Sequence, residues 1–228
     1  MLRYAVLGML GLAASTAWAQ QTPPAETTTP ASTPAARAVI AMEEPKQGDF
    51  WTYEQRDEIS GKVKEVRTNL VTEVTATEIS VRFEVKDSST EGQSIYDRSW
   101  NLKDRAPWKY RPHDGAGIQS PLKVGASWKS VGDDVNPTNG NIWKRTSLSK
   151  IVGQETVTTR AGTFETFKVE TKINRHPTKD PTRKMEIVQQ TWYAPSIDHW
   201  AKRIFVSREN NLLRIHNTFE LVDYGRKQ

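Results

Sequence analysis

The stretch ISVRFEV, residues 79–85, decides the fold class, because apolar and charged or polar side chains alternate strictly along it. Ile79, Val81, Phe83 and Val85 fall on one face of an extended chain, and the residues between them fall on the other. A period of two residues is typical of a β-strand with one buried face. The stretch therefore predicts a half-buried strand.

The same alternation recurs on both sides of this stretch. It is clear in Leu213–Leu221, and it recurs in Tyr96, Arg98, Trp100 and Leu102, where the charge places the strand at an edge or rim. Less regular strand candidates cover residues 50–56, 64–75, 142–152, 155–159, 165–171, 185–193 and 200–207. Short turns rich in Gly and Asn separate them, as antiparallel neighbours require. We predict an all-β fold, either an antiparallel sandwich or an incompletely closed barrel.

A faint internal repeat bears on this architecture. Lys46–Trp51 reads KQGDFW and Lys123–Trp128 reads KVGASW, so both contain K-x-G-x-x-W ahead of a long alternating segment. The repeat is compatible with a fold built from two similar halves. Chance, or a common way of entering a sheet, explains the same three matches equally well, and these explanations stay open.

The N-terminal part of the sequence predicts export. Residues 1–19 combine one basic residue, a short apolar run and small residues ending at Ala19, as a cleaved signal peptide does. The run is shorter than the roughly 20 apolar residues that span a bilayer. Residues 20–38 are rich in Pro, Thr and Ala, so we expect a disordered leader. Residues 39–228 then form a single β-rich domain, which we expect to be periplasmic or secreted.

Composition narrows the chemistry further. The chain has no cysteine, so it has no disulfide, no thiol chemistry and no cysteine to carry a lipid anchor. Its formal net charge of +5 is spread among 27 acidic residues, which gives no indication of nucleic-acid binding. Every later apolar run is interrupted by charge, so we do not expect an integral membrane protein.

Two motifs carry a resemblance. RAGTFETFKVET, residues 160–171, reads as a tight turn at Ala161 and Gly162 followed by a strand, and TWYAP follows at residues 191–195. Together they resemble a family of uncharacterised exported bacterial β-domains with an AGTF corner, usually preceded by proline, and a WYAP motif. Arg160 stands where that proline would be. The resemblance implies an envelope location and a curved antiparallel sheet, and it implies no activity.

The sequence contains no recognisable catalytic or metal-binding pattern. His113, His176, His199 and His216 stand at no ligand spacing, so we interpret them as surface or rim residues and expect no metal. The carboxylate pair Asp133-Asp134 lies in a polar stretch and is expected to be solvated. Neither a G-x-S-x-G serine nor a phosphate-binding glycine loop is present. We therefore predict a non-enzymatic protein without a cofactor.

The aromatic residues suggest a ligand face. Several tryptophans stand beside basic or aromatic neighbours, a mixture that suits an amphipathic ligand, although core packing is the ordinary role of tryptophan in a β-domain. The candidate ligand face consists of Trp100, Trp108, Tyr110, Arg111, Trp192, Tyr193, Trp200, Lys202 and Arg203. The basic run 172–184 is expected to form a hairpin loop that is either solvated or in contact with anionic groups.

These observations predict an exported cell-envelope protein that binds an amphipathic component, namely a lipid, lipopolysaccharide or glycan. The alternative is a structural or assembly module that binds an envelope protein through a sheet edge. Nucleic acid is not an expected partner.

Overall fold

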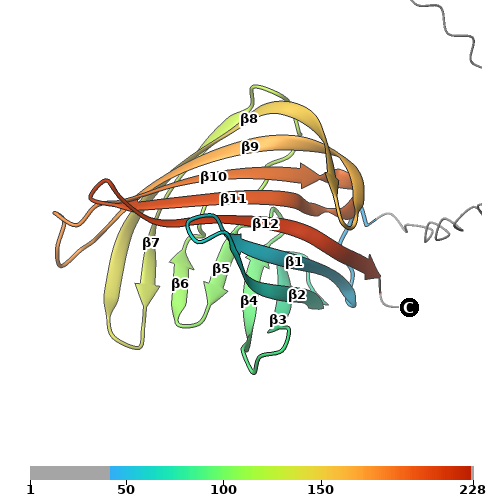
Figure 1. Cartoon of the computed structure of the whole chain (residues 1–228). Coiled ribbons are helices and arrows are strands. Elements are labelled where there is room, and N and C mark those ends of the chain that lie inside the picture. Colours follow the sequence, from blue (N-terminus) through green and yellow to red (C-terminus); the bar gives the residue numbers. More distant parts are fainter. Residues whose placement is uncertain (1–41, 227–228) are drawn as a thin grey trace, which may run out of the picture. The chain divides into compact units, whose positions relative to one another are not determined.

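The structure is a computed structural model and describes residues 42–226 (Figure 1). The expected signal peptide, residues 1–19, and the expected leader, residues 20–38, lie outside the described residues. The described residues belong to one compact unit. No helix among them is long and apolar enough to cross a membrane.

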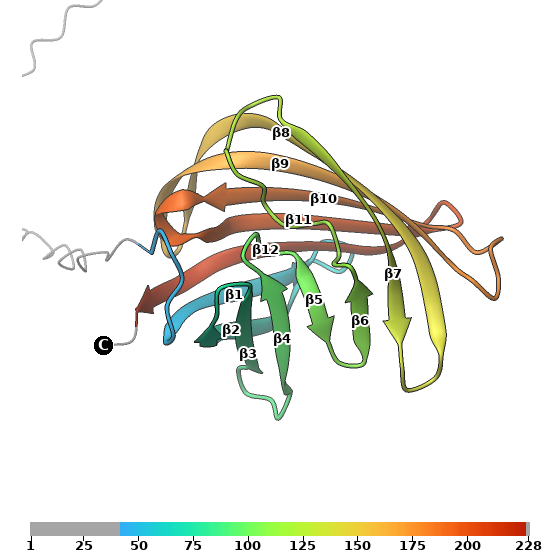
Figure 2. The ribbon, with the colours of Figure 1, turned by 180° about the vertical axis from the view of Figure 1, so that it is seen from behind.

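Residues 42–226 form a closed antiparallel barrel of twelve strands, in which each strand pairs with its neighbours in sequence and β1 pairs with β12. The strands are β1 (Asp49–Asp57), β2 (Lys62–Val74), β3 (Glu78–Val85), β4 (Glu91–Asp97), β5 (Leu102–Arg105), β6 (Trp108–Arg111), β7 (Ser127–Asn136), β8 (Asn141–Thr159), β9 (Gly162–Pro177), β10 (Met185–Ala194), β11 (His199–Glu209) and β12 (Leu212–Arg226). A short 3-10 helix, η1 (Pro195–Ile197), joins β10 to β11. Strands β8 to β12 are long curved ribbons, and the shorter strands β3 to β7 run across them on the other side (Figures 1 and 2).

The all-β prediction is confirmed, but the expected sandwich or incompletely closed barrel is wrong. Strands β1 and β12 are joined by a continuous register that runs from the pair Asp49 and Arg226 to the pair Asp57 and Asn217. Alternation of apolar and polar residues along a strand indicates that one face is buried. It does not indicate whether the first and last strands pair with each other. Closure gives every strand of the described barrel two strand neighbours.

One predicted strand is interrupted. The segment from Tyr96 to Leu102 turns back on itself, so that Tyr96 in β4 pairs with Leu102 in β5. A carboxylate oxygen of Asp97 accepts hydrogen bonds from the backbone N–H groups of Ser99 and Asn101, both at 2.9 Å. Trp100 adopts a positive φ of 59° inside this turn. The side chain of Asp97 therefore organises a turn where the sequence pattern suggested a continuous strand.

The two K-x-G-x-x-W segments form matching turns. Gly48 and Gly125 have φ values of 93° and 92°, in the region that favours glycine. The backbone N–H of Gly48 donates to the carbonyl of Val71 at 2.9 Å, and that of Gly125 donates to the carbonyl of Ile151 at 2.8 Å. Each turn thus fastens the start of one strand, β1 or β7, to the interior of the strand that follows it.

The alternating direction of the strands defines two ends of the barrel. The hairpins that join β1 to β2, β3 to β4, β9 to β10 and β11 to β12 lie at what we call the hairpin end. The opposite end is filled by apolar side chains and by η1. Trp51, Met42, Ile79, Ile197 and Leu221 are fully buried there. The apolar core closes one end of the barrel and leaves the hairpin end for a cavity.

Candidate binding site

A cavity of about 290 Å³ lies inside the barrel, next to the apolar core. Its aromatic and apolar wall includes Trp51, Tyr53, Tyr96, Trp100, Trp200, Phe205, Ile215 and Phe219. Its polar wall includes Gln55, Glu65, Arg67, Asn69, Arg105, Asp114, Gln189, His199, Arg203 and Asn217. The cavity therefore combines a large apolar surface with several ionisable groups.

The deep part of the cavity is a stack of aromatic rings around His199. The imidazole ring lies 3.6 Å from Trp200 and 4.4 Å from Trp51, measured between ring centroids. Trp100 meets it edge-on at 4.7 Å. Rings packed against one another in this way leave little free aromatic face at the bottom of the cavity.

His199 is enclosed, although it was interpreted as a surface or rim residue, and that interpretation is wrong. Its side chain is buried, and the hydroxyl of Tyr53 lies 2.5 Å from its Nδ1. The same hydroxyl donates to the carbonyl of Trp200 at 2.7 Å, and its single proton leaves Nδ1 as the donor in the other bond. Burial, with a smaller effect of nearby Arg203, holds the pKa of His199 well below its usual value. The imidazole is therefore neutral at pH 7.

Three arginine side chains border the described cavity. Arg67 on β2 lies 2.8 Å from Glu65, and its Nε has no hydrogen-bond partner among residues 42–226. Arg105 on β5 donates to the hydroxyls of Ser94 and Tyr96, both at 2.7 Å. Arg203 on β11 donates through Nε to Thr191 at 3.1 Å. Arg105 and Arg203 thus have neutral partners.

The pKa values of these groups reflect their enclosure. Burial, together with a smaller effect of nearby Arg105, lowers the pKa of Arg203 to about 10, although Tyr96, Tyr53 and Asp114 act in the opposite direction. Burial also lowers the pKa of Arg67. Both guanidinium groups remain protonated at pH 7, so the cavity carries buried positive charge.

Asp114 is one of the two carboxylates that border the cavity, the other being Glu65. It accepts hydrogen bonds from the backbone N–H groups of Ala116 at 2.9 Å and Leu102 at 3.1 Å. Burial raises its pKa, whereas these two hydrogen bonds and the positive charge of Arg145 act in the opposite direction. Both hydrogen bonds end on Oδ1, so the chain itself occupies one of the two carboxylate oxygens.

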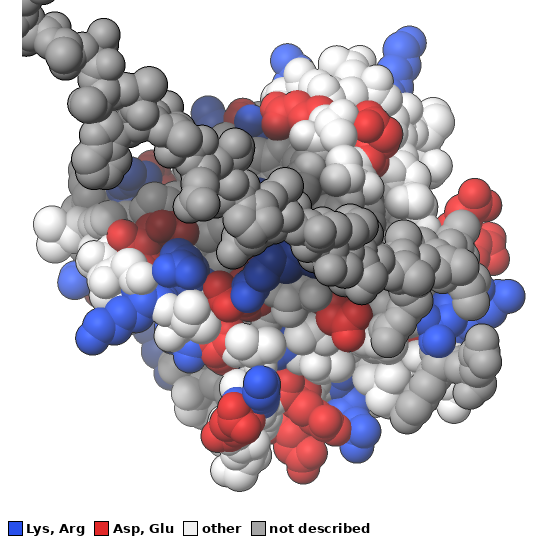
Figure 3. All heavy atoms as spheres, turned by 45° about the vertical axis from the view of Figure 1, so that its right-hand side comes forward, with Lys and Arg blue, Asp and Glu red and all other residues white. Residues whose placement is uncertain are grey.

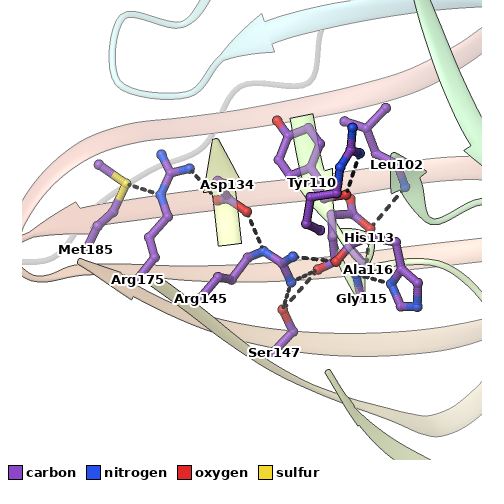
Figure 4. Close-up of polar contacts among 12 residues, drawn as sticks. Leu102, Tyr110, His113, Gly115, Ala116, Asp134, Arg145, Ser147, Arg175 and Met185 are labelled. Atoms are coloured by element: carbon purple, nitrogen blue, oxygen red, sulfur yellow. Dashed lines mark hydrogen bonds and ion pairs between the residues drawn. The ribbon is translucent and has the colours of Figure 1, made fainter. Parts of the chain in front are cut away.

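The segment that carries Asp114 is clamped into the barrel by Arg145 (Figure 4). The guanidinium of Arg145 donates to the backbone carbonyl of Asp114 at 2.5 Å and to that of His113. It also pairs with Asp134 at 2.7 Å, and both side chains are almost completely buried. Arg175 approaches the second oxygen of Asp134 at 3.4 Å. This network, which we call the arginine clamp, fixes one wall of the cavity.

The expectation that Asp133 and Asp134 are both solvated is half wrong. Asp133 pairs with exposed Lys144 at 2.9 Å, whereas Asp134 on the opposite face of β7 is 1% exposed. Adjacent residues of a strand point to opposite faces, so one carboxylate enters the barrel. The sequence showed no partner for it, because Arg145 and Arg175 come from other strands.

Part of the predicted ligand face does line the cavity. Trp100, Trp200 and Arg203 all border it. Tyr193 belongs to the buried core instead, where its hydroxyl donates to Asp198. The remaining predicted residues do not line the cavity; they are Trp108, Tyr110, Arg111, Trp192 and Lys202. Sequence reasoning missed Arg67, Arg105 and Asp114.

Trp108, Tyr110 and Arg111 lie on the short strand β6. Tyr110 packs against the core, and burial raises its pKa to about 12. Trp108 is half-buried and pairs with Arg105 across the β5–β6 hairpin. Arg111 is exposed. The aromatic and basic residues of this stretch therefore do not form a shared ligand face.

Trp192 and Lys202 lie together on the outer face of the barrel. The ammonium groups of Lys168 and Lys202 lie 4.9 Å and 5.4 Å from the ring of Trp192, one from each neighbouring strand. The indole N–H donates to Glu155 at 2.8 Å. Lysine stems and a carboxylate thus cover Trp192, which is only 7% exposed.

Local irregularities in the ladder bring two pairs of cavity residues to the same face of the sheet. In β11, Trp200 pairs with Tyr193 and Lys202 pairs with Trp192, so the ladder has a bulge between them. A similar shift between β4 and β5 pairs Leu102 with Tyr96 and Arg105 with Ser94. A bulge adds a residue to one strand and reverses the alternation beyond it. Trp200 and Arg203 can therefore face one cavity, as can Leu102 and Arg105.

The outer surface shows no comparable concentration of one charge in the view of Figure 3. There, Lys and Arg side chains are interspersed with Asp and Glu. Exposed pairs such as Arg82 with Glu84 at 2.9 Å and Lys103 with Glu78 follow the same pattern. The surface in this view therefore carries mixed charge, whereas three arginines border the cavity.

Comparisons with known proteins concern the fold. A family model described as DUF3108-like matches residues 131–198. No curated protein matches the sequence. The resemblance drawn from the RAGTFETFKVET and TWYAP stretches stays a prediction.

Solved structures with a similar fold come from three bacteria. A protein assigned as a lipoprotein from Parabacteroides distasonis has a TM-score of 0.56 and 14% identity, over 82% of this chain and 100% of its own. A protein assigned as exported, with a YmcC-like fold, from Bacteroides fragilis has a TM-score of 0.52 and 16% identity, over 79% and 97%. The hypothetical lipoprotein YmcC from Escherichia coli has a TM-score of 0.47 and 8% identity, over 80% and 87%.

Proposed function

We propose that this protein is an exported envelope protein that binds an amphipathic molecule inside its barrel. The observation that carries the proposal is the cavity of about 290 Å³, which combines an aromatic and apolar wall with partly buried cationic side chains. Small-molecule sites are typically concave and largely apolar, with a few polar groups that orient the ligand. The cavity has both features.

The apolar wall continues toward the hairpin end. Phe219 pairs with Arg203, Phe205 pairs with Asn217 one step further along, and Ile215 pairs with Ser207 beyond them. Ile215 is 38% exposed and also borders the cavity, so the cavity reaches solvent there. A ligand could enter at this end without unfolding the core.

Size and shape favour a lipid over the other ligand classes. The volume of about 290 Å³ is near the lower limit of roughly 300 Å³ for small-molecule sites, so one chain and one head group fit, rather than a whole lipopolysaccharide. A sugar ring would need a free aromatic face. Both sides of Trp200 are instead approached at 3.6 Å, by the ring of His199 and by the guanidinium of Arg203.

The proposed location is the periplasm or the exterior of the cell. The expected signal peptide supports export, and the fold is shared with proteins assigned as exported or as lipoproteins. The sequence has no cysteine to carry a lipid. We propose that the domain acts without lipidation and without catalysis.

The alternative, an assembly module that binds a partner through a sheet edge, has less support. It depends on a strand with a free side, and each strand of the described barrel has a neighbour on both sides along at least part of its length, although residues 153–159 of β8 pair with β9 alone.

The binding proposal is tested with the full-length exported protein, stripped of bound lipid and titrated with dodecanoate. We expect a saturable change in tryptophan fluorescence and a rise in the melting temperature. Ile215→Glu, at the mouth of the cavity, should weaken binding. Val131→Glu is the control, because Val131 is 62% exposed and does not border the cavity. Absence of saturable binding, or equal effects of both variants, would contradict the proposal.

A further inference from the structure

We propose that the cavity recognises the anionic head group of a single-chain lipid, a carboxylate or a phosphate monoester, through Arg67, Arg105 and Arg203. This inference rests on the proposed function and specifies the chemistry of the ligand. It also assigns an orientation, with the head group inside the barrel and the chain pointing to the hairpin end.

The charges around the cavity are not balanced. Its described wall contains three arginines against the carboxylates of Glu65 and Asp114. Glu65 is already paired with Arg67 at 2.8 Å, and Asp114 accepts two backbone N–H groups. Buried positive charge is costly unless a negative group offsets it. An anionic ligand would supply that group.

Arg105 and Arg203 retain donor capacity. A guanidinium has five N–H donors. Arg203 uses one of them, on Thr191, and has no other side-chain hydrogen-bond partner within residues 42–226. Arg105 uses two, on Ser94 and Tyr96. These hydroxyls fix the directions of the two side chains without neutralising them, as a preformed anion site requires.

The arginines are also close enough to repel one another. The positive charge of Arg105 lowers the pKa of both Arg67 and Arg203, in each case in addition to the effect of burial. Like charges that converge in a partly enclosed space destabilise the empty protein. An anion bound between them attracts each guanidinium and so offsets their mutual repulsion. This supports a shared anion site.

The register of the strands sets the orientation of the ligand. Arg203 lies at the level of Phe219, and Phe205 and Ile215 follow in the direction of the hairpin end. On the other side of Arg203, Trp51 and Trp100 are packed with exposures of 0% and 5%. A chain attached to a head group at Arg203 therefore extends along Phe205 and Ile215.

The test compares four probes with the same twelve-carbon chain on the wild-type protein. They are dodecanoate, dodecyl phosphate, dodecanol and dodecyltrimethylammonium. Because hydrogen bonds to a charged group contribute more than neutral ones, we expect both anions to bind about tenfold more tightly than dodecanol, or better. The cation should bind most weakly. The ratio of the dissociation constants of dodecanoate and dodecyl phosphate shows whether the site prefers a carboxylate or a phosphate.

The outcomes distinguish the two proposals. If dodecanol and the cation bind as tightly as the anions, the head-group inference is wrong and the binding function stands. If no probe binds, both proposals fail.

Variants locate the effect at the arginines. Arg203→Gln and Arg105→Gln should each weaken dodecanoate binding about tenfold and weaken dodecanol binding much less. Arg203→Lys should retain part of the preference for anions. Arg82→Gln is the matched control, because Arg82 is 51% exposed and does not border the cavity. Equal losses for dodecanoate and dodecanol would overturn the inference, and the wild-type comparison decides it if a variant does not fold.

Discussion

The guanidinium carbon of Arg203 lies 3.6 Å from the centre of the Trp200 ring, although strict alternation would place these residues on opposite faces of β11. The bulge beside Trp192 and Tyr193 places both at the cavity. A cation over an indole ring is attracted by its π electrons, most strongly where water is partly excluded. The pair links the charged part of the cavity to its aromatic part.

This pair makes Trp200 the reporter of ligand binding. An anion that engages Arg203 changes the position of the guanidinium over the ring, so we expect the fluorescence change on dodecanoate binding to be lost in Trp200→Phe. Trp192→Phe is the control, since Trp192 lies on the outer face among Lys168 and Lys202. Steady-state fluorescence titration of both variants measures the difference. A signal that depended on Trp192 would place the ligand outside the barrel.

The arginine clamp should dominate the stability of the cavity wall. Asp134→Asn leaves the buried Arg145 without a counter-charge, which we expect to lower the free energy of unfolding by about 3–5 kcal/mol. The neighbouring variant Asp133→Asn removes a pair whose side chains are 35% and 55% exposed, and should cost less than about 1 kcal/mol. Urea denaturation followed by circular dichroism measures both. Similar losses for the two variants would contradict a structural role of the clamp.

Alanine substitutions at Gly115 and Gly140 provide a second matched comparison of stability. Both have positive φ values, +69° and +67°, so alanine at either position should cost about 1–2 kcal/mol in backbone strain. A Cβ at Gly115 would lie 2.3 Å from the Cβ of Ser130, whereas nothing lies within 4 Å at Gly140. We expect Gly115→Ala to cost at least about 1–3 kcal/mol more, because the segment must move.

Movement of that segment should also affect binding, because Asp114 and Ala116 border the cavity. Thermal unfolding and dodecanoate titration of Gly115→Ala and Gly140→Ala check both parts of this prediction. Equal melting temperatures would show that the segment is not packed against β7 as described.

Burial of His199 predicts a loss of stability in mild acid. Its folded-state pKa is held well below the usual value of 6.5, so below that pH the unfolded chain binds a proton that the folded barrel does not. The free energy of unfolding should therefore fall as the pH drops below 6.5. In His199→Gln this part of the pH dependence should disappear. Urea denaturation between pH 5 and 8 gives the slope of the unfolding free energy against pH for the wild type and for His199→Gln. Identical slopes would argue against an enclosed imidazole.

Asp198 should affect the pH dependence of stability in the opposite direction from His199. Burial raises its pKa from 3.8 to about 6, with a smaller opposing effect of the hydrogen bond from Tyr193. The folded state then binds the extra proton, so stability from this group is present below pH 4 and is lost as the pH rises to 6.

Asp198→Asn should remove that decline and be more stable than the wild type at pH 7. Asparagine also suits the left-handed conformation at this position, where φ is 44°. The gain should be below the roughly 3 kcal/mol that a shift of about two pKa units represents, because the group is partly solvated. Denaturation at pH 4, 5, 6 and 7 provides the comparison. A variant that is less stable at every pH would show that the ionised carboxylate is needed.

Sequence periodicity predicted most of the strands and missed three consecutive ones. Ile79 and Val81 in β3 are buried as expected, and predicted segments 142–152 and 155–159 are both parts of β8. Strands β5, β6 and β7 were not predicted. In β7 the buried side chains include Ser130 and Asp134, and the partners of Asp134 come from other strands. A pattern of apolar residues cannot reveal a strand with a polar inner face.

The cavity was only partly visible in the sequence for a related reason. Arg67 stands among polar residues of β2 and looks like a solvent-facing side chain, and Arg105 lies in a strand that was not predicted. Bulges add to the difficulty. Leu213 shares the parity of Ile215, yet the ladder shifts between them, so that Leu213 pairs with Arg208 and Ile215 with Ser207. Such shifts depend on neighbouring strands, and a single sequence does not specify them.

The pairing of β1 with β12 affects how the protein folds. The residues that must meet, from Asp49 with Arg226 to Asp57 with Asn217, are separated by nearly the whole domain. During synthesis the chain emerges in order, so the first strand has one unpaired side until the last strand has arrived. Shortening the polypeptide by its final strand would therefore leave the earlier ones exposed to chaperones and proteases.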